Sequence, residues 1–434
     1  MSRLVLRGAR WPGDVAMADG RITAVGSVPE QAGDEVVRVD GDIVTAGLVN
    51  THHHFYQWMT RGWAFDCTLF DWLTTLYPVW ARLMPEDVEA AAAVAMGELA
   101  LTGCTTAADH HYLVPGGDDS VFDAIAAAAR TIGIRAHIAR GSMDLGQSKG
   151  GLPPDSVVEE LDAILSSTQS VYERLHDGER IVVTVAPCSP FSVTSELMTE
   201  SAALARRHGL RLHTHLAETL DEERDCLERF GRRPLQVLDD IGWIASDVWV
   251  AHGIHFDDAE VLRLAETGTG IAHCPSSNCR LGSGIARVVD LTKAGAPVGL
   301  GVDGVASNEI GGLFPEMRMA LFLARQRDLT STTFLPVDAL RLATEGGARC
   351  LGRDDVGRLE PGYRADVAVW PGDDLADVLD PLAGLVLGPE RHARHVLVEG
   401  EYVVRDGNLL GADIHALRRE LARRARRLWP QGAR

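Results

Sequence analysis

Short apolar runs that end in polar residues alternate with alanine-rich amphipathic stretches along most of this chain. The runs are GLVNTHHH, CTTAADHH, IRAHIAR, IVVTVAPCS, LRLHTHLAE, DVWVAHG, GIAHCPSSN and PVGLGVDG, and helical stretches such as 85–103 and 121–133 separate them. Apolar runs between helices are typical of parallel strands that are buried on both faces. The eight units predict an α/β fold, a (β/α)8 TIM barrel, over residues 48–355.

The two ends of the chain have a different pattern. Residues 1–47 hold short β-type runs separated by D-G turns, and such runs return in residues 356–434, which close with a helical stretch. We therefore expect a small β-sandwich domain whose halves come from both chain ends, the second half carrying the terminal helix. The arginine run in that helix, DIHALRRELARRARRLWP, is typical of a solvated helix face.

The composition limits the kinds of partner that the protein is expected to bind. Lys and Arg total 42 against 61 Asp and Glu, a net charge of −19, so nucleic acid and anionic membranes would be repelled and a small-molecule partner is favoured. The seven cysteines form no CxxC pair and their number is odd, which favours reduced thiols and the cytoplasm. We find neither a signal peptide nor a run of ~20 apolar residues.

Three consecutive histidines follow the first apolar run. In extended chain alternate side chains share a face, so His52 and His54 should project together into the barrel while His53 points outward. Two neighbouring imidazoles can share one metal ion. An HxH pair alone is also compatible with ordinary packing.

More metal-binding side chains end later runs. The fifth run offers His213 and His215, with Glu218 three residues after His215, the sixth ends with His252 and the eighth with Asp303. Taken singly, His215 could be a core histidine, His252 a hydrogen-bonded strand end and Asp303 a helix N-cap. Together they converge at the carboxyl ends of barrel strands, where imidazole and carboxylate suit zinc or ferrous iron.

This set resembles the amidohydrolase superfamily, in which HxH, HxxE, His and Asp follow the first, fifth, sixth and eighth strands. AGLVNTHHH and GRLEPGYRADVAVW also resemble its terminal motifs, so the likeness spans essentially the whole chain. The resemblance implies one divalent metal per chain, Zn2+ with Fe2+ as the alternative. The implied ligands are His52, His54, His215 and Asp303, and the implied catalytic residues are Glu218, His252 and Asp303.

Binuclear members of the family carry a carboxylated lysine at the end of the fourth strand. The fourth run here is IVVTVAPCS, and the two lysines of the chain, Lys149 and Lys293, lie far from every predicted strand end. The sequence therefore excludes a lysine-bridged pair of metals.

The resemblance implies hydrolytic deamination. A bound metal makes a water molecule acidic enough to attack, and Asp303 and His252 would orient that water and accept its proton. Glu218 would protonate a ring nitrogen of the substrate and help pass a proton to the departing ammonia.

Within the family the chain resembles the cytosine deaminase-like branch, through NTHHHFYQ, CTTAADHHYLVP, APCSPFSVT and HCPSSNCRLGSG. Relatives that act on nucleosides grip ribose with a glutamate where this chain has LYPVWARL. We expect a free nucleobase-like heterocycle, first of all 8-oxoguanine, which would give urate and ammonia. Guanine, pterins and hydroxylated amino-s-triazines are alternatives, and an inactive scaffold is a remote one.

Five side chains are candidate substrate contacts: Gln57, Trp80, Tyr112, Arg140 and Cys188. The amide of Gln57 can both donate to and accept from a lactam edge. Each also has a structural alternative; Trp80 could be core, and Arg140 could pair with a carboxylate such as Asp144. Cys274 and Cys279 have no second ligand pair and are expected to be buried thiols. Family habit implies a homo-oligomer, a dimer or larger.

Overall fold

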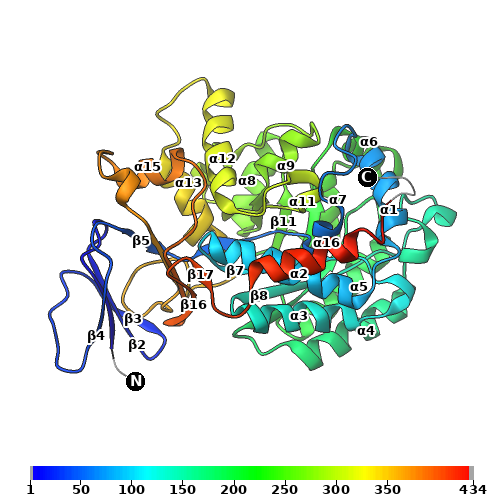
Figure 1. The fold of residues 1–434 in the computed structure, drawn as a ribbon. Helices are drawn as coiled ribbons and strands as arrows, with labels where there is room; N and C mark the ends of the chain where they lie inside the picture. Colours follow the sequence, from blue (N-terminus) through cyan, green and yellow to red (C-terminus); the bar gives the residue numbers. More distant parts are fainter. Residues whose placement is uncertain (1–2, 430–434) are drawn as a thin grey trace.

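A closed barrel of parallel strands forms the body of the molecule (Figure 1). The computed structural model describes residues 3–429. The barrel strands are β6 (Leu48–Asn50), β7 (Cys104–His111), β8 (Arg135–Ser142), β9 (Ile181–Pro187), β10 (Leu212–Leu216), β11 (Val248–His252), β12 (Gly270–His273) and β13 (Val298–Leu300). They follow one another in sequence order around the barrel, and each coincides with one of the eight apolar runs, β8 extending two residues past the end of its run. The predicted (β/α)8 barrel is confirmed.

Helices surround the barrel and return the chain to its amino end. They are α2 (Pro85–Leu101), α3 (Ser120–Ile132), α4 (Leu161–Leu175), α5 (Ser195–Arg207), α6 (Leu220–Phe230), α7 (Pro234–Asp240), α8 (Asp258–Thr267), α10 (Val288–Ala294), α12 (Leu313–Asp328) and α13 (Pro336–Arg341). In α3, Val121, Ile125 and Ile132 lie on one buried face, and Gly133 ends the helix with a φ of 91°.

Shorter elements lie in the connections. Above the carboxyl ends of the strands are η1 (Phe55–Thr60), α1 (Leu69–Trp80), α9 (Pro275–Arg280) and α11 (Val305–Asn308). The others are η2 (Pro115–Gly117), η3 (Gln147–Lys149), η4 (Asp155–Val157), the π-helical turn η5 (Leu342–Gly346), α14 (Gly347–Cys350), η6 (Asp373–Leu375) and α15 (Pro381–Leu387).

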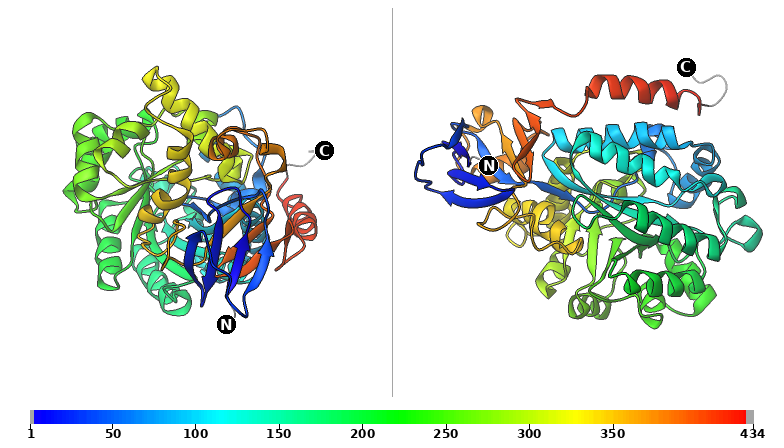
Figure 2. Two further views of the ribbon diagram at one scale, coloured as in Figure 1. Left: turned by 90° about the vertical axis from the view of Figure 1, so that its left-hand side faces the viewer. Right: turned by 90° about the horizontal axis from the view of Figure 1, so that it is seen from below.

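Two sheets form the small β-domain beside the barrel (Figure 2). One holds β1 (Leu4–Arg7), β2 (Asp14–Ala18), β3 (Arg21–Gly26) and β4 (Glu35–Arg38), and the other β5 (Ile43–Ala46), β14 (Val367–Trp370), β15 (His395–Val398), β16 (Glu401–Arg405) and β17 (Asn408–Leu409). Their inner faces share one core that includes Leu6, Met17, Val44, Val367 and Leu397. Both chain ends therefore build the predicted sandwich.

The chain passes from the sandwich to the barrel within one residue. Strand β5 pairs with β14 of the sandwich, and β6 begins the barrel directly after Gly47. A Cβ atom at Gly47 would lie 2.2 Å from the Thr105 side chain, so the close approach of the two segments requires glycine.

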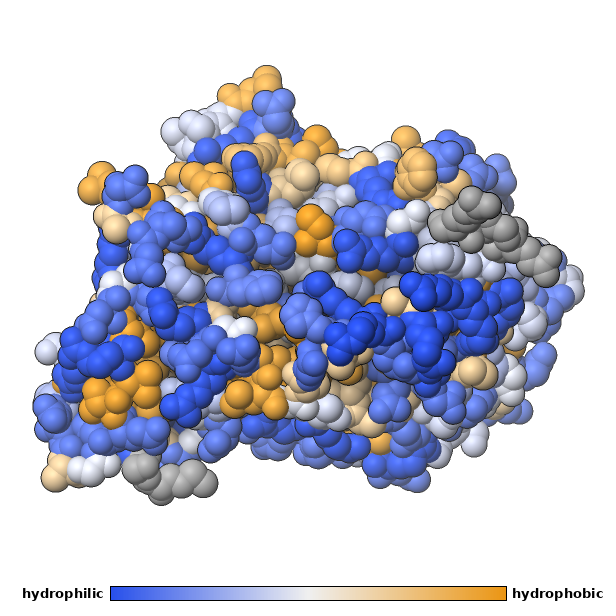
Figure 3. Space-filling view, in the orientation of Figure 1, coloured by the Kyte–Doolittle hydropathy of each residue, from blue (hydrophilic) through white to orange (hydrophobic). Residues whose placement is uncertain are grey.

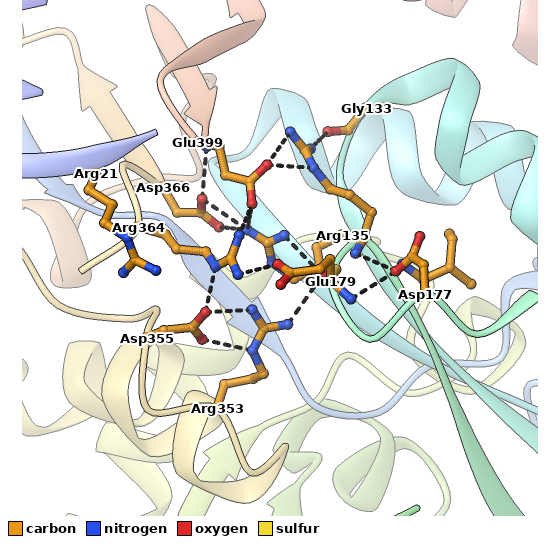
Figure 4. Close-up of polar contacts among 12 residues, drawn as sticks. Arg21, Gly133, Arg135, Asp177, Glu179, Arg353, Asp355, Arg364, Asp366 and Glu399 are labelled. Carbon is orange, nitrogen blue, oxygen red and sulfur yellow. Dashed lines mark hydrogen bonds and ion pairs between the residues drawn. The ribbon is translucent and has the colours of Figure 1, made fainter. Parts of the chain in front are cut away.

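Buried and half-buried ion pairs join the sandwich to the amino ends of barrel strands (Figure 4). The guanidinium of Arg135, the first residue of β8, is fully buried and lies 3.2 Å from Asp366 and 3.5 Å from Glu399. Arg180, just before β9, lies 2.8 Å from Glu399. Arg364 joins the same group through Glu399. These charges attach the sandwich at the end of the barrel opposite the polar strand ends.

The terminal helix α16 (Ile414–Ala425) packs against barrel helix α2, as Figure 2 shows from below. Arg418 pairs with Glu98 of α2, and Arg424 and Arg427 pair with Asp87. The outward face over α16 is strongly hydrophilic in Figure 3, as predicted for a solvated arginine face. Among residues 3–429 no helix is long and apolar enough to cross a membrane.

The Arg135–Asp366 pair predicts a large effect on stability. Asp366→Ala would leave the more distant Glu399 as the one carboxylate paired with the buried Arg135 guanidinium, which should cost about 3–5 kcal/mol of unfolding free energy. Unfolding in denaturant measures this loss of unfolding free energy. Asp40→Ala, which breaks an exposed pair with Arg38, is the control and should hardly move the transition. Equal shifts in the two variants would contradict the role of the buried pair.

Candidate active site

Six polar side chains meet at the carboxyl ends of four barrel strands. His52 and His54 follow β6, His215 lies in β10 with Glu218 just after it, His252 ends β11, and Asp303 follows β13. All six are at least nine-tenths buried. The alternation of strand side chains and the shared strand ends therefore bring together the residues that the sequence pattern selected.

The protonation of His54 and His215 follows from their hydrogen bonds. Nδ1 of His54 donates to the carbonyl of His110 at 2.6 Å, and Nδ1 of His215 donates to the carbonyl of Cys188 at 2.7 Å. Since a carbonyl only accepts, each Nδ1 carries the hydrogen and each Nε2 presents a lone pair. These two Nε2 atoms lie 3.2 Å apart.

His52 is fixed in the same tautomer by a relay. Nδ1 of His213 donates to the carbonyl of Trp249 at 2.8 Å, so Nε2 of His213 must accept. Nδ1 of His52, 2.8 Å away, is the donor, which leaves the Nε2 lone pair of His52 facing the site. The four predicted metal ligands, His52, His54, His215 and Asp303, are called the ligand group below. His213 supports His52 and is not a member of this group. His53 packs beside Phe55, outside the group.

A carboxylate completes the group. Oδ1 of Asp303 lies 3.3 Å from Nε2 of His52 and 3.2 Å from Nε2 of His54, and neither Oδ1 of Asp303 nor Nε2 of His52 has a hydrogen-bond partner. Ligands at ~2.0–2.1 Å from a tetrahedral zinc ion lie roughly 3.3 Å from one another. The lone pairs and their spacings therefore fit a divalent cation.

The charge states of these side chains also suit a metal site. Burial lowers the pKa of His52 and His215 well below the usual range, so both imidazoles are neutral. Burial would by itself raise the pKa of the Asp303 carboxyl, whereas the two hydrogen bonds that its Oδ2 atom accepts from Ser277 and Ser307 favour the ionised form. Neutral imidazoles and an ionised carboxylate are the forms that bind metal.

Two serines orient Asp303. Its Oδ2 atom accepts hydrogen bonds from Ser277 at 2.6 Å and from Ser307 at 3.1 Å, while Oδ1 faces the histidines. Asp303 itself has a left-handed backbone, with a φ of 62°. Ala217 and His252, with φ of 53° and 71°, share this conformation, and such strain in non-glycine residues concentrates at functional sites.

Glu218 and His252 form a second pair beside the ligand group. Oε2 of Glu218 lies 3.6 Å from Nε2 of His252, and Nδ1 of His252 lies 2.9 Å from Oδ1 of Asn278. Burial, and then the negative charge of Asp303, raise the pKa of the Glu218 carboxyl well above its usual range. A buried acid of this kind can keep a proton at neutral pH and give it to a bound molecule.

A small cavity of about 30 Å³ lies over these groups. Of the predicted substrate contacts, Gln57, Tyr112 and Cys188 line it. Further lining residues, which the sequence pattern did not single out, are Leu69, Trp72, Leu73 and Tyr77 of α1, with Phe191 and Leu281. The cavity therefore has a polar floor and an apolar, largely aromatic roof.

Trp80 and Arg140 do not line this cavity. Trp80 packs against Trp72 and Tyr56 and donates to Thr60, so it belongs to the core. The guanidinium of Arg140 is buried against Glu159, with separations of 2.8 and 3.0 Å.

The carboxylate of Asp144 instead accepts from Thr194, so it is not the partner of Arg140. Trp72, eight residues before Trp80, supplies the indole at the cavity. The expectation of two buried thiols holds for Cys274, whereas Cys279 is exposed.

His110 is a site residue that the sequence pattern did not select. Nitrogens of His52, His54, His110 and His215 lie within 4.8 Å of one another. Nε2 of His110 donates to the carbonyl of Ala186 at 2.9 Å, and its ring stacks on that of His215. The DHH end of the second apolar run is the sequence signal that could have found it.

Comparisons with known proteins agree with this geometry. The model of the Amidohydrolase family matches residues 43–403. The chain belongs to this family. It is 50% identical over 415 residues to an 8-oxoguanine deaminase of Pseudomonas aeruginosa, covering 93% of this chain and 92% of that protein. It is 38% identical to a hydroxydechloroatrazine ethylaminohydrolase of Pseudomonas sp. strain ADP, covering 81% and 77% of the two chains.

A relative of known crystal structure has the same fold as this amidohydrolase. The atrazine chlorohydrolase of Arthrobacter aurescens TC1, crystallised with zinc, superposes with a TM-score of 0.92 at 30% identity, over 97% of this chain and 100% of that one. The family and the fold predicted from the motifs are confirmed.

The support of Asp303 predicts a metal-binding phenotype. Ser277→Ala removes the 2.6 Å hydrogen bond that orients the carboxylate, and should weaken Zn2+ affinity about 10–100-fold. Competition with a chromophoric chelator measures the Zn2+ affinity. Ser201→Ala, at a buried serine on α5 whose hydroxyl has no partner, is the control and should bind Zn2+ as the wild type does. Unchanged affinity in Ser277→Ala would show that Asp303 needs no such support.

Proposed function

We propose that this amidohydrolase removes the exocyclic amino group of a free aminated heterocycle by hydrolysis, with 8-oxoguanine as its substrate and urate and ammonia as products. The observation that carries the proposal is the convergence of three imidazole lone pairs, one carboxylate and the Glu218–His252 pair at one small cavity. The relative that is 50% identical over most of both chains, an 8-oxoguanine deaminase, supports the choice of substrate.

The cofactor in this proposal is one Zn2+ per chain, held by His52, His54, His215 and Asp303. The donor set of neutral imidazoles and a carboxylate suits zinc, and the atrazine chlorohydrolase was crystallised with it. When bound, the ion supplies the Lewis acidity that makes a water molecule a nucleophile at neutral pH.

The acid and base roles follow from the surroundings of each group. Asp303 is ionised and has one oxygen free of hydrogen bonds, so it can orient an attacking water and accept its proton, together with His252. Glu218, whose raised pKa favours the protonated acid, would donate to a ring nitrogen next to the amino-bearing carbon. It would then help pass a proton to the departing ammonia.

Gln57 is the side chain best placed to read the heterocycle. It is buried, lines the cavity, and its Oε1 atom has no partner. A Cβ atom at Gly304 would lie 1.7 Å from this oxygen, so the glycine after Asp303 makes room for the amide. Tyr112 and Cys188 complete the polar contacts in this proposal. A donor and an acceptor on one amide suit the lactam edge of an oxopurine.

The roof of the cavity favours a flat free base over a nucleoside. Helix α1 closes it with apolar and aromatic side chains, and Trp72 is held there by a hydrogen bond from Nε1 to the carbonyl of Ala306 at 3.3 Å. The free volume of about 30 Å³ is far below the ~300 Å³ of an ordinary ligand pocket, so we expect α1, which closes the roof, to shift when the substrate binds. A homo-oligomeric state and a cytoplasmic location remain predictions.

A substrate panel tests the proposal. The purified Zn2+-loaded protein should release ammonia from 8-oxoguanine with a kcat/KM at least tenfold above those for isoxanthopterin and N-ethylammeline, because Gln57 and the small cavity suit an unsubstituted oxopurine. Guanine, which has the same lactam edge and lacks only the 8-oxo group, is assayed beside them. A coupled assay for ammonia and ultraviolet detection of urate measure both products. Turnover of the triazine or the pterin with none of 8-oxoguanine would overturn the substrate, and no turnover at all would favour a scaffold.

A further inference from the structure

We infer that Glu222 is a positioning residue for the reaction: its buried carboxylate fixes the backbone that carries Glu218 and, through the same backbone, the loop that carries His252. The inference rests on the proposed roles of Glu218 and His252. Glu222 lies outside the cavity and touches neither the ligand group nor the space for the substrate. Its contacts nevertheless converge on the catalytic pair.

The carboxylate of Glu222 binds two consecutive backbone amides. One oxygen accepts from the N–H of Ala217 at 2.9 Å, and the other accepts from the N–H of Glu218 at 2.8 Å. The side chain is fully buried. Both oxygens therefore have a defined partner within the segment that places the catalytic acid.

Ala217 explains why this segment needs support. Its φ of 53° is left-handed, a conformation that costs an L-residue free energy unless its surroundings impose it. A left-handed residue turns successive N–H groups toward one concave side, where an anion can bind both. The carboxylate of Glu222 occupies that position and so stabilises the turn that directs Glu218 toward the cavity.

The same segment reaches His252. The carbonyl of Ala217 accepts from the N–H groups of Ile254 and His255, at 2.9 and 3.0 Å, in the loop that follows β11. The N–H of Gly253 in turn donates to the carbonyl of Leu216. A shift of residues 216–218 would therefore change the position of His252 as well as that of Glu218.

The capped first turn of α6 places Glu222 for this task. Thr219 caps the helix and accepts from the N–H of Glu222, which fixes the first turn. The side chain can then fold back over that turn toward residues 217 and 218. Only a carboxylate offers two acceptor atoms; a glutamine would present an NH2 group to one of the two N–H donors. An aspartate would be too short to reach both.

The test compares Glu222→Gln with the wild type, both loaded with Zn2+ and assayed on 8-oxoguanine. In Glu222→Gln kcat should fall by about 10–100-fold, because the acid and His252 are displaced from their working positions. KM should change less than about threefold, and the Zn2+ content should stay the same, since the proposed substrate contacts Gln57, Tyr112 and Cys188 and the four proposed metal ligands lie outside the displaced segments. Glu222→Asp, which keeps one acceptor near the turn, should give an intermediate kcat and covers the case that Glu222→Gln does not fold.

Asp87→Asn is the matched control. Asp87 is also a fully buried acid in the first turn of a helix, and it accepts from the N–H of Met84, but its other partners are Arg424 of α16 and Arg427 just after that helix. This variant should lose stability and keep kcat. A kcat within twofold of the wild type in Glu222→Gln, or a fall matched by loss of Zn2+, would overturn the inference.

Glu218→Gln separates this inference from the proposed function. It should abolish nearly all turnover of 8-oxoguanine and keep Zn2+. Retained turnover in Glu218→Gln would overturn the acid role and with it the inference about Glu222. Loss of turnover in Glu218→Gln with normal kcat in Glu222→Gln would overturn the inference alone.

Discussion

Three imidazole lone pairs and one carboxylate oxygen face one another at separations near 3.2 Å in a buried space, and only a cation makes this arrangement favourable. The surrounding structure keeps the lone pairs turned inward. Backbone carbonyls hold the hydrogens of His54 and His215 on Nδ1, His213 does the same for His52, and two serines turn the second oxygen of Asp303 away. The proposed metal ligands are thus held with their lone pairs facing one another by the surrounding protein groups.

The barrel supplies the common point at which these groups meet. Its eight parallel strands end on one side, so residues separated by some 250 positions in sequence become neighbours. The sandwich is attached at the opposite end through Arg135, Asp366 and Glu399, which leaves the strand ends free for α1 and the loops that enclose the cavity. Left-handed turns at Ala217, His252 and Asp303 then direct the last side chains inward.

The barrel and the ligand group could be predicted because they depend on local rules: apolar runs mark strands, and alternation selects His52 and His54. The roof could not. Trp72 and Trp80 lie eight residues apart on one helix, which is roughly 80° of rotation, so they face different surroundings. Arg140 finds Glu159, a partner 19 residues away that no spacing rule indicates. Glu222 is one of three acids that open α6, and its inward fold depends on the turn at Ala217.

The most direct test of the metal site is anomalous X-ray diffraction at the zinc edge, on crystals of the protein purified with Zn2+. We predict one peak per chain, at ~2.0–2.2 Å from Nε2 of His52, His54 and His215 and from Oδ1 of Asp303. A peak bound by His110 or by the Cys188 sulfur in place of Asp303, or no peak in a folded protein, would contradict the account.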